Sequence, residues 1–272
     1  MNDGDTADRS LAHWSEEGRA EMDAFYRVAT LDYRELVAAW GHTPQLTGAP
    51  RRILDVACGS GKFPAALRQD EAIRSLPAGA LTLDLLDPSA FSVDEAAQSL
   101  ASPMQAGRRL VCTLQDLPDD ATGYDVVWAV HALYALPESE LAAGVARFLS
   151  ALGDDGWGFV GHATAASHYL RFYEAYLPRF RPEGTPYLGA EAVIAAFEAA
   201  GASVETRALE YVQAIHDDAV LEGFLQRCLF DGSLSLGAMR ADDALGAYLA
   251  ERTGADGVTR FTQHVAMITI RR

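Results

Sequence analysis

The segment from Arg52 to Ala65 reads R-I-L-D-V-A-C-G-S-G-K-F-P-A, and it decides the fold. Residues 53–56 form a short run, apolar except for one aspartate, with the composition of a buried parallel strand. Gly59 and Gly61 then allow a tight turn at which the backbone can approach a ligand closely. Pro64 suits the first turn of a following helix, because its φ is already helical. A strand, a glycine turn and a helix in this order predict a nucleotide-binding corner of an open α/β sheet.

The spacing of the glycines indicates which nucleotide the corner binds. Pro64 stands where a dinucleotide fingerprint needs a third small residue, and Lys62 is followed by Phe63, where a Walker motif needs Ser or Thr. The acid Asp55 followed by A-C-G-S-G instead resembles the glycine motif of class I S-adenosylmethionine-dependent methyltransferases, which usually have Gly at the position of Ala57. This resemblance implies S-adenosyl-L-methionine as cofactor and S-adenosyl-L-homocysteine as product. The cofactor-binding residues it implies here are Asp55, Ala57, Gly59 and Gly61; a glycine turn without a ligand is the alternative.

A second strand, expected over 81–86, ends in Asp87-Pro88-Ser89. An acid at the tip of this strand can accept hydrogen bonds from both ribose hydroxyls, since a carboxylate has two acceptor oxygens. Asp87 is the candidate for that role, with Pro88 beside it. Capping of the helix that starts near Ser89 is an alternative role for Asp87, and the two roles are compatible.

Composition limits the classes of function. The chain has 272 residues, enough for one large α/β domain with additions, and a formal net charge of −16 without a Lys/Arg-rich run. This charge argues against a nucleic-acid substrate and is compatible with a cationic small molecule, although acidity also serves solubility.

The three cysteines have no metal-ligand spacing, so we expect no metal and a reduced, cytoplasmic protein. No apolar run is long enough for a membrane span. The oligomeric state stays open.

The remaining segments predict a Rossmann-like α/β sheet with helical additions. Residues 1–49 are expected to be an acidic tail, disordered to about residue 10, followed by a helical cap and a linker. Residues 50–272 are expected to form the methyltransferase domain, with helical insertions near 165–187 and 216–257. Further strands are predicted at 110–114, 124–130, 156–161, 203–215 and 261–270, with helices at 89–100, 138–149 and 189–200. The methyltransferase resemblance implies a seven-stranded sheet with the strand order 3-2-1-4-5-7-6.

Several stretches also resemble the histamine N-methyltransferase family. They are the D-P-S-A that begins at Asp87, the V-W-A-V-H-A-L-Y-A-L of 127–136, the tyrosine-rich helix near 169–176 and the closing F-T-Q-H-V-A-M-I-T-I of 261–270. Carried over by position, the resemblance implies a set of substrate-binding residues: Tyr26, Asp32, His131, Tyr134, Tyr169, Tyr173 and Gln263. A helix packing stripe is the alternative for Tyr169 and Tyr173, and a structural role is the alternative for Gln263. The broader methyltransferase resemblance implies that Asp116 meets the adenine amino group, with turn capping as its alternative, and Val130 is expected to pack against the adenine.

Two of these positions are candidates for catalysis. Asp32 falls near the family's glutamate that holds the substrate ammonium, and its alternative is a solvated helix residue. His131 replaces the family's ring-binding glutamine, so an imidazole substrate is in doubt; it could orient a nucleophile or accept its proton. A core or capping histidine is the alternative. Ala135 replaces a second family tyrosine, which would widen the pocket.

The sequence therefore predicts a methyltransferase of class EC 2.1.1 that acts on a small molecule. The expected methyl acceptor is a nitrogen of an amine or N-heterocycle, attacked in line by an SN2 step. Two alternatives stay open. One is an O- or C-methyltransferase that tailors a bacterial secondary metabolite, in which the tyrosines pack an aromatic substrate. The other is a non-catalytic subunit that binds S-adenosylmethionine. The substrate itself is not identified by these residues.

Overall fold

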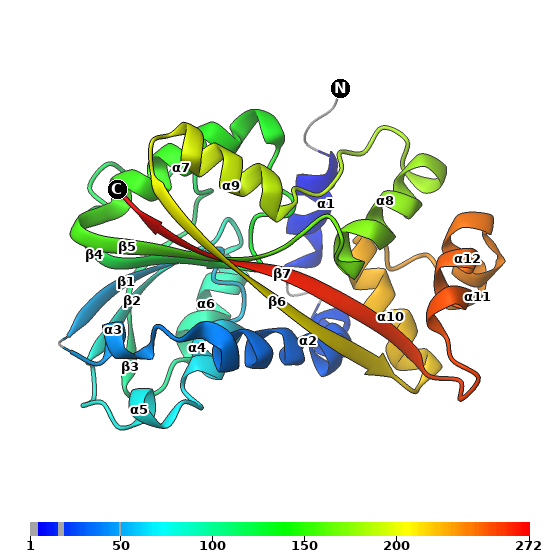
Figure 1. Ribbon diagram of the computed structural model, residues 1–272, viewed down its shortest axis with the longest axis horizontal. Coiled ribbons are helices and arrows are strands. Elements are labelled where there is room, and N and C mark those ends of the chain that lie inside the picture. Colours follow the sequence, from blue (N-terminus) through cyan, green and yellow to red (C-terminus); the bar gives the residue numbers. More distant parts are fainter. Residues whose placement is uncertain (1–4, 16–18, 49) are drawn as a thin grey trace.

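A computed structural model describes residues 5–15, 19–48 and 50–272 of the chain. Its centre is one seven-stranded sheet with the order β3-β2-β1-β4-β5-β7-β6 (Figure 1), as predicted. Strands β1 to β5 are parallel, and β7 is antiparallel to both β5 and β6. The strands are β1 (Arg51–Val56), β2 (Leu81–Leu86), β3 (Met104–Leu110), β4 (Tyr124–Val130), β5 (Leu152–Ala163), β6 (Ser203–Ile215) and β7 (Thr259–Arg271).

Helices cover both faces of this sheet. In Figure 1, α7 and α9 lie on one side, and α2, α4 and α6 lie on the other. The helices are α1 (Asp5–His13), α2 (Arg19–Trp40), α3 (Thr43–Leu46), α4 (Lys62–Leu67), α5 (Glu71–Arg74), α6 (Ala90–Ser99), α7 (Glu138–Ala151), α8 (His168–Phe180), α9 (Ala190–Ala199), α10 (Asp218–Leu229), α11 (Leu236–Ala241) and α12 (Asp243–Arg252). Among the described residues, no helix combines the length and the apolar character that crossing a membrane requires.

Alternate residues of the central strands supply two separate cores. Leu54 of β1 packs with α7 and α9, whereas Ile53 packs with α2, α4 and α6 on the opposite face. Trp40 at the end of α2 is fully buried against Phe63 and Trp128 in edge-to-face contacts. Since α2 is fastened to the sheet at this end, its earlier turns are held in a fixed position above the carboxyl ends of the strands.

A third core lies beyond the carboxyl ends of the strands. The helices α8, α10, α11 and α12 pack together against the long antiparallel pair of β6 and β7 (Figure 1) and share a cluster rich in aromatic residues. Phe224 of α10 and Phe261 of β7 are both fully buried in this cluster. We call α8 with α10–α12 the helical cap. Its helices lie at residues 168–180 and 218–252.

Two local predictions are wrong. Residues 5–10, expected to be disordered, belong to α1, which is held by polar contacts: Arg9 Nη1 donates to the carbonyl of Leu229 at 3.0 Å, and Thr6 Oγ1 donates to that of Thr185 at 2.9 Å. The spacing of apolar residues, on which the helix predictions depended, gives no sign of such polar contacts. The third strand is β3, which ends at Leu110, where the predicted strand begins. As an edge strand, β3 is polar, so it lacks the apolar run on which the prediction depended.

Candidate active site

The glycine corner after β1 has a left-handed backbone at three positions. Ala57, Gly59 and Gly61 have φ values of 50°, 49° and 73°. A Cβ atom on Gly61 would lie 2.2 Å from Ser99 Oγ and 3.3 Å from Ala96 Cα of α6, so a side chain there would displace Ser99, and the positive φ would add strain. Ala57 tolerates this conformation at a cost, which gives a physical reason for the glycine usual at this position in the resembling motif.

Asp87 follows β2 and holds the corner in place. Its Oδ2 accepts a hydrogen bond from the Gly59 N–H at 3.0 Å, and its Oδ1 accepts one from the Ser89 N–H at 2.9 Å. Ser89 rather than Asp87 caps α6, by accepting from the Ser92 N–H. Burial raises the pKa of Asp87 to about 6, against these two hydrogen bonds, which lower it. Each oxygen keeps a free lone pair for a ligand hydroxyl.

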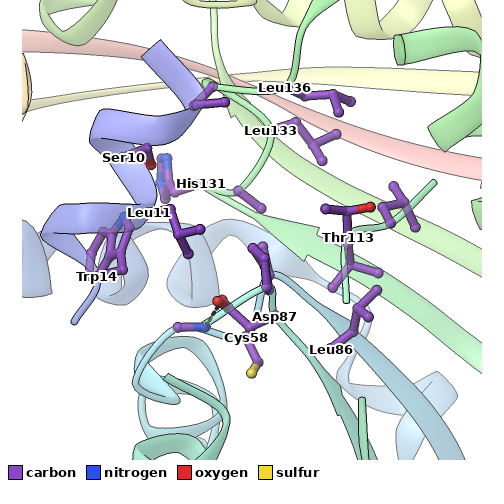
Figure 2. A pocket seen from close by; sticks show the side chains of 18 of the residues that line it. Ser10, Leu11, Trp14, Cys58, Leu86, Asp87, Thr113, His131, Leu133 and Leu136 are labelled. Atoms are coloured by element: carbon purple, nitrogen blue, oxygen red, sulfur yellow. Dashed lines mark hydrogen bonds between the residues drawn. The ribbon is translucent and has the colours of Figure 1, made fainter. Parts of the chain in front are cut away.

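A cavity of about 370 Å³ opens at the carboxyl ends of β1, β2 and β4. Six of the eight predicted cofactor-binding residues line it: Asp55, Ala57, Gly59, Asp87, Pro88 and Val130. Figure 2 shows Asp87 and His131 on different sides of this space, with Ser10, Leu11 and Trp14 along its edge. We call it the cofactor cavity. Helix α1, which the sequence did not predict, therefore forms part of its wall.

The other two predicted cofactor residues lie outside this lining. Gly61 precedes α4 and serves the packing of α6. Asp116 is exposed, and its carboxylate accepts a hydrogen bond from Thr113 Oγ1 at 2.6 Å, as in the turn-capping alternative. Thr113 and Gln115, from the same loop, line the cavity in its place. Sequence reasoning missed them because it ended β3 four residues too late.

A smaller cavity of about 70 Å³ adjoins the first. Three residues line both cavities: Trp14, Tyr33 and His131. Predicted substrate residues Asp32, Tyr134 and Tyr169 line the smaller one, together with Phe25, Tyr187 and Arg227, which the sequence did not single out. We call it the acceptor cavity. Its walls come from α2, α8 and α10, so they could be assembled only by the tertiary fold.

Asp32 is buried in the acceptor cavity, with 2% of its surface exposed. Its Oδ2 accepts from the Tyr169 hydroxyl at 2.5 Å, and its Oδ1 accepts from Gln213 Nε2 at 2.6 Å. Burial raises the pKa of Asp32 to about 7, although both hydrogen bonds lower it. Among the residues that the structure describes, no cationic side chain forms an ion pair with it.

Gln263 is connected to Asp32 through one intervening residue, Gln213. Its Nε2 donates to Gln213 Oε1 at 2.7 Å, and its Oε1 accepts from Ser167 Oγ at 2.5 Å. Each amide thus accepts one hydrogen bond through its oxygen and donates the next through its nitrogen. The resulting chain of hydrogen bonds ends on the Asp32 carboxylate. Gln263 lines neither cavity; the structure places it as support for Asp32.

The two remaining predicted tyrosines take different places. Tyr173 stands behind the acceptor cavity, stacked on Tyr187 with ring centroids 3.7 Å apart, and its hydroxyl accepts from Arg9 Nη2. Tyr26 lines the cofactor cavity, where the Lys62 ammonium lies 4.6 Å from its ring centroid. The structure therefore does not bring Tyr26 or Tyr173 into the acceptor cavity.

The residues of the cofactor cavity suit S-adenosylmethionine. Oδ2 of Asp55 is buried without a hydrogen-bond partner in the described part of the chain, and burial raises the pKa of Asp55 to about 7. A ligand N–H or positive charge would satisfy that oxygen, whereas a diol would suit Asp87. Leu86, Val130 and Leu133 give apolar walls for a base. Asp55 and Asp87 with this apolar lining match a cationic nucleoside.

Comparison with known proteins supports this match. Residues 53–156 match a family model described as a methyltransferase domain. No protein of curated function matches the chain.

Solved structures of similar fold include several methyltransferases. A Bacillus halodurans protein described as a methyltransferase has 12% identity and a TM-score of 0.58, and the match covers 86% of this chain and 97% of that one. The magnesium protoporphyrin IX methyltransferase of Synechocystis PCC 6803, solved with bound S-adenosylmethionine, has 13% identity and a TM-score of 0.55, with 98% of both chains covered. The plantazolicin methyltransferase, solved with S-adenosylhomocysteine, has 14% identity and a TM-score of 0.52, covering 98% and 96%. Residues 53–156 therefore match a methyltransferase domain, the sheet has the strand order of the seven-stranded methyltransferase fold, and the residues of the cofactor cavity fit S-adenosylmethionine.

Proposed function

We propose that this protein transfers a methyl group from S-adenosylmethionine to a nitrogen of a small amine or N-heterocycle bound in the acceptor cavity. The observation that carries the proposal is the environment of Asp32. This carboxylate is buried beside the cofactor cavity, and Tyr169 and Gln213, which donate hydrogen bonds to it, are both neutral. A buried carboxylate without a cationic partner is costly, so a cationic ligand is the natural complement.

Aromatic side chains around Asp32 favour the same class of ligand. Phe25, Tyr33 and Tyr169 line the cavity with Asp32, and the faces of such rings attract ammonium groups. The cavity volume of about 70 Å³ suits a compact group and not a polymer. A small amine, held by its charge and by these rings, fits both features.

The bound cofactor would supply an activated methyl group. The chain supplies position and proton control. Asp32 would hold the ammonium and, with a pKa of about 7, could take its proton near neutral pH, which frees the nitrogen lone pair. Gln213 and Gln263 hold the carboxylate in place. Trp14, Tyr33 and His131 line the junction where the two cavities meet.

A panel of small primary, secondary and heterocyclic amines, with phenols of matched shape, tests the proposal. Purified protein is incubated with S-adenosylmethionine carrying a labelled methyl group, and products are analysed by mass spectrometry. Label on an amine nitrogen, lost in Asp32→Asn, is the expected result. Glu95→Gln, on α6, is the matched control and should keep its activity. Cofactor binding without turnover of any compound would contradict the proposal.

Arg227 favours a second candidate function. Its guanidinium is buried in the acceptor cavity and lies 4.0 Å over the Trp14 ring. A cation there would complement a phenolate or carboxylate, and so an O-methyltransferase. Label on oxygen in the same panel, lost in Arg227→Met but kept in Asp32→Asn, would select this function over the first.

A further inference from the structure

The hydrogen bonds around Tyr134 determine which nitrogen of His131 carries the proton. Tyr134 Oη accepts from the Ala163 N–H at 3.3 Å and lies 2.7 Å from His131 Nδ1. Burial keeps the pKa of Tyr134 well above its usual value, so its hydroxyl retains its hydrogen. Within the described part of the chain, His131 Nδ1 is the group within hydrogen-bond distance that can accept from that hydroxyl. Tyr134 therefore donates to Nδ1, and the neutral ring carries its hydrogen on Nε2.

The opposite tautomer leaves the hydrogen of the Tyr134 hydroxyl unsatisfied. If Nδ1 carried the hydrogen, it would donate to a Tyr134 oxygen that already accepts from Ala163, and the Tyr134 hydrogen would have no acceptor. Buried hydroxyl groups without partners are rare in native proteins. The geometry therefore favours the tautomer with hydrogen on Nε2.

The groups around His131 keep it neutral. Burial lowers its pKa to about 3, and His162 of β5 lowers it as well. Tyr33 of α2 and Tyr169 of α8 face the ring, with centroids 5.7 and 6.5 Å away. Asp32 and Arg227 line the same cavity with opposite charges. A neutral ring that already carries hydrogen on Nε2 cannot accept a proton at that atom.

His131 stands where the two cavities meet, and its Nε2 is unsatisfied. That atom is buried and has no hydrogen-bond partner among the described residues. The backbone adopts a φ of +52°, unusual for a residue with a side chain, and is held by the hydrogen bond from the His131 N–H to the Gly161 carbonyl at 2.8 Å. Such conformations persist where the surroundings impose them, often at functional sites.

We propose that His131 is a fixed, neutral hydrogen-bond donor, set in this tautomer by Tyr134, which selects methyl acceptors that present a lone pair beside the atom to be methylated. The matching ligand group is an ether, hydroxyl or carbonyl oxygen, or an unprotonated ring nitrogen. His131 is then a specificity residue and Tyr134 a positioning residue. This inference deepens the proposed function and rests on it for the identity of the ligand, whereas the tautomer can be tested without turnover.

Ring-nitrogen NMR measures the tautomer directly. Protein labelled with ¹⁵N-histidine is titrated from pH 5 to 9, and the His131 signals are assigned by their loss in His131→Gln. The expected result is hydrogen on Nε2 with no titration in this range, and partial loss of the tautomer preference in Tyr134→Phe. Hydrogen on Nδ1, or titration near pH 6–7, would overturn the inference. S-adenosylhomocysteine binding checks that each variant is folded.

Substrate preference tests the donor role. Two amines are compared that carry either an ether oxygen or a methylene at one position, separated from the reacting nitrogen by two carbons so that both amines are protonated at neutral pH. Wild type should favour the oxygen compound by ~10-fold in kcat/KM, the worth of one hydrogen bond. His131→Gln keeps an N–H donor and should keep the preference, whereas His131→Leu should lose it. A preference that survives in His131→Leu would overturn the role. If neither compound reacts although the NMR result holds, the proposed function fails and the tautomer stands.

Discussion

The hydroxyl of Tyr169 donates a hydrogen bond of 2.5 Å to Oδ2 of Asp32, and this contact joins α8 of the helical cap to α2 across the acceptor cavity. This hydrogen bond favours the charged form of the carboxylate, whereas burial favours the neutral form. The pKa of Asp32 is raised to about 7, which shows that burial is the stronger effect. With a pKa close to neutral pH, the gain or loss of one hydrogen bond changes the fraction of Asp32 that is charged.

We expect amine binding to weaken as the pH falls through 7. Below that pH Asp32 takes a proton and no longer attracts a cation, so the affinity should drop by about tenfold per pH unit. Tyr169→Phe removes a hydrogen bond that lowers the pKa, so its profile should move to higher pH. Calorimetry with a bound amine measures both profiles. A profile for Asp32→Asn that still falls with acid would assign the effect to another group.

Replacement of Asp87 should weaken cofactor binding. Asp87→Ala removes the acceptor of the Gly59 N–H and the carboxylate that faces the cofactor cavity, so the Kd for S-adenosylhomocysteine should rise by ~10- to 100-fold. Asp94→Asn, on the exposed side of α6, is the control and should bind normally. Equal affinity in Asp87→Ala and wild type would remove Asp87 from the cofactor site.

The left-handed backbone of Ala57 predicts a stabilising substitution. Ala57→Gly relieves a conformation that costs an L-residue about 1–2 kcal/mol. Part of this gain is offset, because glycine loses more chain entropy on folding than alanine does. A net gain of roughly 0.5–1 kcal/mol in the free energy of unfolding is expected from urea titration. Ala195→Gly, exposed within α9, should instead lose about as much. Destabilisation by both would indicate that the methyl group of Ala57 is needed for packing.

Asp55 should make the free protein less stable as the pH rises from 4 to 7. Its folded pKa of about 7 lies above the ordinary value of 3.8, so over this range the native state binds more protons than the unfolded chain. The contribution to stability is complete below pH 4 and lost above 7. Asp55→Asn should flatten this slope and add on the order of 1–3 kcal/mol at pH 8. The exposed control Asp155→Asn should keep the wild-type slope.

The fold was predictable because its determinants are local. The glycine corner, the apolar strands and the acid after β2 are short patterns in the sequence. They account for five of the six predicted residues that line the cofactor cavity, and Val130 came from the resemblance. The edge strand β3 was misplaced because it has one neighbour and polar residues. Helix α1 was missed because Arg9 and Thr6 dock it through polar contacts with distant segments.

The acceptor cavity was only partly predictable, for a related reason. Asp32, His131, Tyr134 and Tyr169 came from family resemblance, and the structure brings them together. Arg227 lies in α10, far along the chain, and no local pattern distinguishes it from other helical arginines. The role of Gln213 depends on its pairing with Gln263 across β6 and β7, which only the register of the two strands defines.

Arg9 offers a test of how α1 is held. Arg9→Ala removes its donors to the Leu229 and Phe230 carbonyls, so release of S-adenosylhomocysteine should be faster, by ~10-fold in stopped-flow experiments. Arg109→Ala, on the exposed surface of β3, should release it at the wild-type rate. An unchanged rate in Arg9→Ala would mean that α1 does not limit exit.

Because α1 lines the cofactor cavity and is hydrogen-bonded to the helical cap, we expect ligand binding in the two cavities to be thermodynamically linked. We expect an acceptor that stabilises the helical cap to stabilise the position of α1 as well. By reciprocity, a bound cofactor should then raise the affinity for the acceptor. Ordered kinetics, with the nucleoside entering first and leaving last, are the expected signature of this shared wall.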